Sequence, residues 1–279
     1  MNRRPVFLIT MLCFGFAFFY IPILSMIVYS FNASRLATVW GGFSTKWYVT
    51  LFSNRQVLAA LLLSLKIALV SATAATLLGT MAGIALVRFR RFRGRLLFSG
   101  LVTAPLIMPD VITGISSLMF FILMAEWVGW PGSRGFTTIT LAHITFSMVY
   151  VTTVVQARMV QADQAIEEAA MDLGSRPWQV LFDITLPAIF PAIMSGWLLA
   201  FTISLDDVVI TSFTTGPGST TLPLLIWSKV KMGVTPDINA LATLMVAVVG
   251  LGVLVAGIAM NRAERRRNAD ARLAYQANE

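Results

Sequence analysis

The chain has 279 residues, of which 57% are hydrophobic and 12% are charged, and its mean hydropathy is +0.78. Soluble domains are about 45–50% apolar and about 25% charged, so this composition excludes an ordinary soluble protein. The formal charge of +8 does not indicate nucleic-acid binding, because the arginines flank apolar runs, where anionic lipid headgroups lie.

Six apolar runs follow one another along the chain, each long enough to cross the roughly 30 Å hydrocarbon core of a bilayer. They cover residues 5–31, 57–87, 96–125, 136–155, 189–213 and 239–260. In lipid every backbone N–H and C=O group needs an internal partner, so runs of this length and apolarity must form helices. The sequence therefore predicts an all-α integral membrane protein with six transmembrane helices.

The first run follows Arg3 and Arg4, an arrangement that is also found in secretory signals. It is much longer than the roughly 7–15-residue apolar core of such a signal, and no small-residue cleavage site follows it closely. We therefore interpret it as a retained anchor. Cys13, inside this run, is the only cysteine, which excludes a disulfide or a thiolate metal cluster within the chain.

Basic residues concentrate on alternate loops between the runs. One set is Arg3, Arg4, Arg88, Arg90, Arg91, Arg93, Arg95, Arg158, Arg176, Arg262, Arg265, Arg266, Arg267 and Arg272, and the smaller opposite set is Arg35, Lys46, Arg55, Arg134, Lys229 and Lys231. The positive-inside rule places the richer set, and both termini, in the cytoplasm.

The chain is expected to have three parts. We expect residues 1–56 to form the first helix and an outer loop. Residues 57–260 would form a five-helix core with a cytoplasmic loop at 156–188, and residues 261–279 a basic cytoplasmic tail.

The loop at residues 156–188 is predicted to contain two short helices. The run from Asp163 to Gly174 consists of good helix formers, with apolar residues at helical spacing and a glycine at its end. A second helix is expected after it, capped by Ser175 and with Pro177 in its first turn. The two would form a protruding elbow at Gly174, although amphipathicity alone is equally typical of a plain surface connection.

This loop also carries a spaced motif, EAA-x3-G-x9-I-x-L-P. Its fixed positions are Glu168, Ala169, Ala170, Gly174, Ile184, Leu186 and Pro187. The motif resembles the signature of ABC importer permeases at every fixed position. The resemblance implies the type I permease fold, in which this loop forms the helix that engages a separate ATPase. The chain has no G-x-x-x-x-G-K-[ST] phosphate loop, so we expect no catalytic residue and no cofactor in it, with ATP and magnesium bound by the partner ATPase.

Acidic residues inside the predicted spans are functional candidates, because a carboxylate in lipid costs several kcal/mol unless it faces a cavity or a partner. Asp110 follows Pro109 in the third run, and Asp206 and Asp207 are adjacent in the fifth. Neighbouring helix positions differ by about 100°, so one acid of that pair is expected to face the pathway and the other a neighbouring helix. For Asp110 a structural role at a broken helix end stays open. Counted at about 1.5 Å per residue from the cytoplasmic ends of their spans, Asp110 and Asp206 lie in the outer half, and an acidic outer mouth suits a cationic substrate.

The sequence around these acids resembles the polyamine permeases, and is more similar to those for putrescine than to those for spermidine. The stretches concerned are 104–114, 204–208, 215–218 and 239–243, and the likeness extends over nearly the whole chain. It implies a heteromeric importer with a second homologous permease, two cytoplasmic ATPase subunits and a periplasmic polyamine-binding protein. The binding protein would contact outer-loop aromatics such as Trp40, Trp47 and Tyr48, which also fit an interfacial aromatic belt.

Three alternatives remain beside this interpretation. An ABC permease for another solute fits the same motif, and a carrier driven by an ion gradient could use His143 as a proton relay. A lone histidine in a span more often makes one helix-to-helix hydrogen bond. The coupling motif also argues against such a carrier, because an ion-driven carrier has no ATPase to engage. A membrane enzyme would need a nucleophile with a base or a metal cluster, which one histidine and one cysteine do not supply. Lys66 is accounted for by snorkelling.

Overall fold

The computed structural model describes residues 6–35, 39–89, 91–233, 235–248, 250, 251, 254 and 258. Within these ranges the regular structure is helical, with one isolated bridge between Asn32 and Phe43. The chain divides into a central unit, residues 56–228, and a terminal unit made of residues 1–55 and 229–279. The basic tail expected at 261–279 lies outside the described residues.

The terminal unit begins with helix α1 (Val6–Tyr29), which confirms the first predicted span. A short helix that the sequence did not suggest, α2 (Lys46–Ser53), follows a loop closed by the buried side chain of Asn32. The Asn32 amide nitrogen donates to the Val39 carbonyl at 2.7 Å, and its oxygen accepts from the Gly41 amide at 2.7 Å. This side chain and the backbone bonds from Ala33 to Gly42 and from Ser44 to Phe31 hold the loop together.

A further helix of the terminal unit, Pro236–Val248, begins slightly before the sixth predicted span. Most of the second half of that span lies outside the described residues. The Lys229 ammonium donates to the Asp237 carboxylate at 3.1 Å and closes the turn that precedes this helix.

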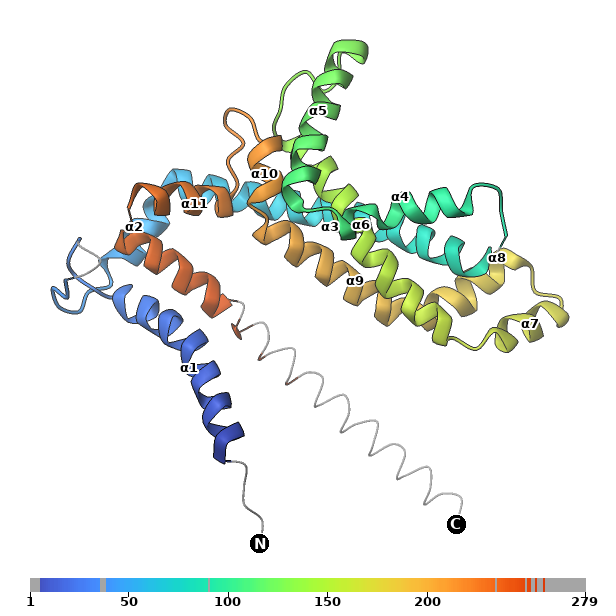
Figure 1. Cartoon of the computed structure of the whole chain (residues 1–279), viewed down its shortest axis with the longest axis horizontal. Coiled ribbons are helices and arrows are strands. Elements are labelled where there is room, and N and C mark those ends of the chain that lie inside the picture. The colour runs from blue at the N-terminus through green and yellow to red at the C-terminus, as the bar shows by residue number, and fades with distance from the viewer. Residues whose placement is uncertain are drawn as a thin grey trace, which may run out of the picture. The chain divides into compact units, whose positions relative to one another are not determined.

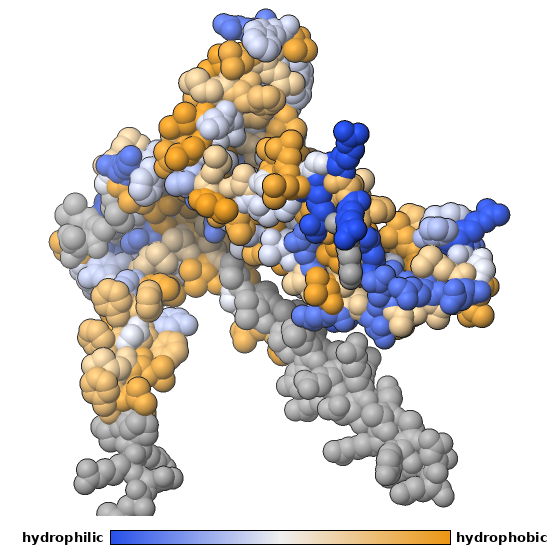
Figure 2. Space-filling view, turned by 45° about the vertical axis from the view of Figure 1, so that its right-hand side comes forward, coloured by the Kyte–Doolittle hydropathy of each residue, from blue (hydrophilic) through white to orange (hydrophobic). Residues whose placement is uncertain are grey.

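The central unit contains most of the helices (Figure 1). In chain order they are α3 (Arg55–Arg88), α4 (Arg95–Ile107), α5 (Asp110–Val128), α6 (Phe136–Gln161), α7 (Gln164–Asp172), α8 (Pro177–Val180), the π-helical turn η1 (Leu181–Thr185), α9 (Leu186–Asp206), α10 (Val209–Thr214) and α11 (Leu222–Met232), whose last residues belong to the terminal unit. By length and composition, five of the described helices could cross a membrane: Phe7–Tyr29, Arg55–Arg88, Asp110–Val128, Phe136–Gln161 and Pro177–Asp206. Much of the visible surface of α5 is hydrophobic, as expected for a helix in lipid (Figure 2).

Two predicted spans are divided in the structure. The prediction of one continuous helix over 96–125 is wrong, because the chain leaves the helical conformation at Met108, where ψ is 135°, and becomes helical again in α5 at Asp110. Pro109 explains this break, since a proline disfavours the helical conformation of the residue before it. The fifth run is likewise interrupted at Asp207, where ψ is 131°, between α9 and α10.

The second short helix predicted in the loop at 156–188 is not separate. It is the start of one continuous helical segment, Pro177–Asp206, made of α8, η1 and α9. Its N-cap is Arg176, not Ser175, because the Gln179 side chain reaches back and accepts from the Arg176 amide at 2.8 Å. Pro177 occupies the first turn as predicted.

Helix α6 lies at the centre of the unit and packs closely on α3. A Cβ atom added to Gly79 of α3 would lie 2.8 Å from the Met148 carbonyl oxygen and 2.8 Å from the Val151 Cβ atom. One turn later, a Cβ atom on Gly83 would lie 2.9 Å from Val155. The two glycines form a G-x-x-x-G pair, the small-residue pattern that allows membrane helices to approach closely.

We predict that Gly79→Leu destabilises the fold by about 1–3 kcal/mol, because its neighbours are backbone and β-branched atoms that cannot move aside. Thermal unfolding of the purified protein in detergent would show a lower midpoint. Gly100→Leu is the matched control, since a Cβ atom on this exposed α4 glycine meets nothing within 4 Å. An equal midpoint for the Gly79→Leu and Gly100→Leu proteins would contradict close packing of α3 on α6.

Candidate functional site

The amphipathic helix predicted between Asp163 and Gly174 is confirmed as α7. Asp163 caps it, with its carboxylate accepting from the Ala165 amide at 2.9 Å. The chain leaves the helix through Gly174, where φ is +91°. This left-handed conformation is readily adopted by glycine and costly for residues with a side chain. The glycine of the motif therefore sets the direction in which the chain returns towards α9.

The apolar stripe of α7 is not covered by its own chain. Ile166 is 58% exposed and Leu173 is 90% exposed, and α7 has no buried residue. Within the motif, Glu168 and Ala169 are also exposed, and the Glu168 carboxylate accepts from Gln164 on the same helix at 3.1 Å. A helix that leaves its apolar face bare is typical of a surface that another protein covers.

Another face of α7 is attached to the membrane helices through Glu167, a residue that the sequence reasoning missed. One oxygen of this carboxylate, Oε1, accepts from the Arg88 guanidinium at the end of α3 and from the Thr185 hydroxyl of η1 at 2.9 Å. The side chains of Arg88 and Glu167 are only 18% and 12% exposed. On a helical wheel Glu167 and Glu168 both lie about 130° from the stripe of Ile166, Ala169 and Leu173, on opposite sides of it, so the spacing alone does not show which of them bonds inward.

The last three motif residues lie where η1 passes into α9. Pro187 has no amide hydrogen, and in a regular α-helix its ring would meet the carbonyl of Asp183. The widened turn Leu181–Thr185 directly before it accommodates this ring. Ile184 is half-buried, and Leu186 packs against the core between α3, α6 and α9.

The second candidate region is the break between α9 and α10. The Asp207 carboxylate accepts from the backbone amides of Ile210 at 3.2 Å and Thr211 at 2.7 Å, and from the Thr211 hydroxyl at 2.8 Å. It thus caps α10 in the way that aspartate caps helix N-termini. The adjacent Asp206 is exposed, whereas the Asp207 side chain is only 11% exposed, so the two acids have different surroundings.

A buried polar chain joins four helices behind this break. The Ser71 hydroxyl of α3 donates to Ser204 of α9 at 2.9 Å, and Ser204 lies 2.7 Å from His143 Nδ1 on α6. His143 Nε2 lies 3.2 Å from Asp207 and 3.1 Å from the hydroxyl of Thr211 on α10. His143 thus bonds helix to helix, the commoner of the two roles considered above.

The order serine, histidine, aspartate in this chain of bonds is also that of hydrolase triads. Here Ser204 is 6% exposed, His143 is 1% exposed, and the Ser204 oxygen already accepts from Ser71. A substrate carbonyl could not reach a hydroxyl enclosed in this way, so the arrangement stabilises helix packing.

Asp110 is exposed at the first position of α5, where the helix dipole favours an acidic side chain. Helix α5 packs on α10, because a Cβ atom added to Gly114 of α5 would lie 2.5 Å from the Phe213 ring of α10. The helix break before Asp110 and the helix break before α10 therefore lie in the same part of the central unit. A cavity of about 600 Å³ lies beside Asp110's break, with Met108 and Phe120 as apolar walls and hydroxyls from Thr113, Ser117 and others.

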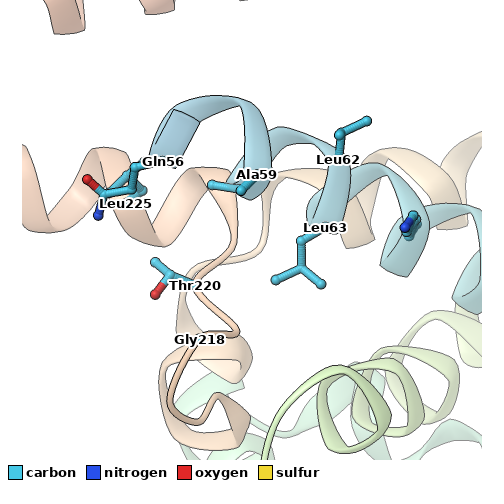
Figure 3. A pocket seen from close by; sticks show the side chains of 9 residues that line it. Gln56, Ala59, Leu62, Leu63, Gly218, Thr220 and Leu225 are labelled. Atoms are coloured by element: carbon cyan, nitrogen blue, oxygen red, sulfur yellow. The ribbon is translucent and has the colours of Figure 1, made fainter. Parts of the chain in front are cut away.

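A cavity of about 480 Å³ lies between the start of α3 and the loop before α11 (Figure 3). Leu63 of α3 and Thr220 of the loop are among the residues that line it, and Lys66 contributes to its wall. The ammonium group of Lys66 makes this cavity unsuitable for a cation, so it does not extend the acidic region.

Comparison with known proteins gives a consistent result. Residues 75–269 match the model of a family described as binding-protein-dependent transport system inner membrane component. The chain is 54% identical over 274 residues to the putrescine transport system permease protein PotI of Escherichia coli K12, covering 97% of this chain and 98% of that protein. It is 42% identical over 253 residues to the spermidine/putrescine permease PotC of the same strain, covering 91% and 93%.

Among solved structures, the chain resembles a subunit of a bacterial ABC transporter that imports alginate. The TM-score is 0.70 at 20% identity, over 93% of this chain and 96% of that one. It also resembles a chain of the MetNI methionine transporter, with a TM-score of 0.58 at 13% identity over 74% and 95%. At these identities the likeness shows the fold alone.

The family match and the two permease relatives show that the chain belongs to the family of binding-protein-dependent transport system inner membrane components, as a multi-pass inner-membrane permease with the helical fold of ABC importers.

Proposed function

We propose that this chain is the permease subunit of an ATP-driven importer of polyamines, with putrescine as its principal substrate. The observation that carries this proposal is the 54% identity to a putrescine permease over 97% of the chain. At this identity the match includes the pathway region as well as the fold, whereas the alginate and methionine transporters share only the fold. The exposed acids at the two helix breaks support a cationic substrate.

The complete transporter would contain a second homologous permease, two ATPase subunits and a periplasmic polyamine-binding protein. ATP and magnesium would bind to the ATPase, and α7 with both chain termini would lie in the cytoplasm. The related alginate transporter has been solved in complex with a ligand-bound periplasmic protein, which supports this kind of partner. Of the outer-loop aromatics, Trp40 is 49% exposed, whereas Trp47 and Tyr48 bond within their own loop. Trp40 is thus the best-placed of the three to meet the binding protein.

Coupling to the ATPase would take place through the motif in α7 and η1. The exposed stripe of Ile166, Ala169 and Leu173 offers the apolar surface that a groove on the ATPase would cover. The proposed coupling residues are Glu168, Ala169, Ala170, Gly174, Ile184, Leu186 and Pro187. The first three lie on α7, Gly174 sets the turn, and the last three join that turn to α9.

The cation route would pass the acidic breaks in α4–α5 and α9–α10. We assign contact with the substrate to Asp206 and Asp110, whose side chains are exposed in this chain. Asp207, also predicted as a pathway residue, has its carboxylate engaged by α10 and His143. It would hold the break in place and so orient its neighbour Asp206.

For the coupling turn, we predict that Gly174→Val retains assembly and ATP hydrolysis but loses most putrescine uptake. At φ +91° a side chain costs about 1–2 kcal/mol, so the turn would take another direction. A steric clash would not explain the loss of uptake, because a Cβ atom at Gly174 meets nothing within 4 Å. Gly174→Asn should lose less uptake, since asparagine tolerates this conformation. Both activities would be measured in proteoliposomes, and normal uptake by the valine variant would contradict the assignment.

For the cation route, we predict that Asp206→Asn lowers labelled putrescine uptake about tenfold at matched membrane abundance, which corresponds to about 1.4 kcal/mol of lost attraction for an ammonium group. The cells would lack other polyamine importers.

The Asp207→Asn variant should lose less uptake, because asparagine still accepts from the α10 amides. Glu126→Gln, on an exposed acid at the far end of α5, is the charge-matched control. If all three variants transport equally, Asp206 does not contact the cation. If the unmodified system imports no putrescine, the polyamine assignment is wrong.

A further inference from the structure

We infer that Glu167, Arg88 and Thr185 form a strut through which movement of α7 reaches the membrane helices. This inference rests on the proposed function, and it assigns a positioning role to residues outside the EAA motif. The three side chains meet at a single atom, Glu167 Oε1. They come from the end of α3, the start of α7 and the turn that leads into α9, so one carboxylate joins three separate elements.

The attachment of α7 depends on this carboxylate. Across the described ranges, Glu167 makes the only side-chain hydrogen bonds that join α7 to another helix. The others on α7 are local, from Gln164 to Glu168 and from Ala165 to Asp163. Since no residue of α7 is buried, apolar packing within the chain holds it weakly. A force applied by a partner at the stripe would therefore be passed on at Glu167.

The charges of the strut lie where helix dipoles favour them. Glu167 is in the first turn of α7, and Arg88 is in the last turn of α3. Both side chains are largely shielded from water, at 12% and 18% exposure, which makes their attraction stronger than that of a surface pair. Glu167 and Glu168 thus differ in kind: the first bonds inward to the membrane helices, and the second is exposed to a partner.

The motif itself builds the third contact. Pro187 requires the widened turn of η1, and Thr185 is the last residue of that turn. Thr185 is 5% exposed, and its hydroxyl lies closer to Glu167, at 2.9 Å, than to the Val180 carbonyl, at 3.3 Å. The proline of the motif thereby places a donor against Glu167 at the base of α9.

The test uses the complete transporter in proteoliposomes, with putrescine uptake and ATP hydrolysis measured on the same preparation. We expect Glu167→Gln to lower uptake per ATP hydrolysed roughly fivefold to tenfold while the ATPase still co-purifies. Asp172→Asn, which removes an exposed acid from the same helix, is the matched control and should keep the unmodified ratio. A loss of folded protein would lower both activities together and leave the ratio unchanged.

Charge reversal gives a second, independent readout. Arg88→Glu and Glu167→Arg each place like charges together and should lower the ratio, whereas the double variant should recover a substantial part of it. An unchanged ratio in Glu167→Gln, loss of the ATPase from that complex, or no recovery in the double variant would each overturn the strut. Absence of putrescine uptake by the unmodified complex would instead overturn the proposed function on which the strut rests.

Discussion

Lipid offers no hydrogen bonds to a polypeptide backbone, so a helix can break inside a span only where the chain itself satisfies the freed groups. The helices are interrupted before Asp110, at Asp207 and in the π-helical turn before Pro187. At Asp207 the chain supplies its own substitute, because the carboxylate accepts the amides that start α10. At the break before Asp110, Pro109 has no amide hydrogen to leave unpaired, and the π-helical turn before Pro187 belongs to the loop predicted at 156–188. The interruptions are thus built in, and both candidate regions of function lie at them.

Much of this could be predicted from the sequence. The apolar runs identify the spans, and the helical spacing between Asp163 and Gly174 identifies α7, because both patterns reflect local burial and backbone preference. The divided spans could not be recognised from hydropathy, because apolar residues continue on both sides of Met108 and Asp207, although Pro109 marks the first of the two breaks. The partners of His143 and Glu167 come from helices distant in the chain, and a single sequence contains no record of such pairing. The G-x-x-x-G pair of Gly79 and Gly83, by contrast, is a packing signal that the sequence does contain.

The two regions differ in how firmly they are held. The acidic break is supported by buried bonds that reach α3, α6 and α9 through Ser71, His143 and Ser204. The α7 region extends from the unit with a bare apolar face and one polar attachment. A rigid site at one end of α9 and a lightly attached helix before its other end are the arrangement expected where an outside event must be passed to a fixed route, since bistable elements are drawn from the less stable parts of a fold.

The π-helical turn Leu181–Thr185 has a consequence for how this segment can vary. Such a turn holds one residue more than the corresponding α-helical turn, so the residues before and after it differ in rotational phase by about 100°. The faces shown by α8 and by α9 are therefore set separately, although the two belong to one continuous helix. Deleting a single residue here would realign them and turn Trp178 and its neighbours to another side. Segment length is thus a constraint in this helix, whereas surface loops tolerate changes in length.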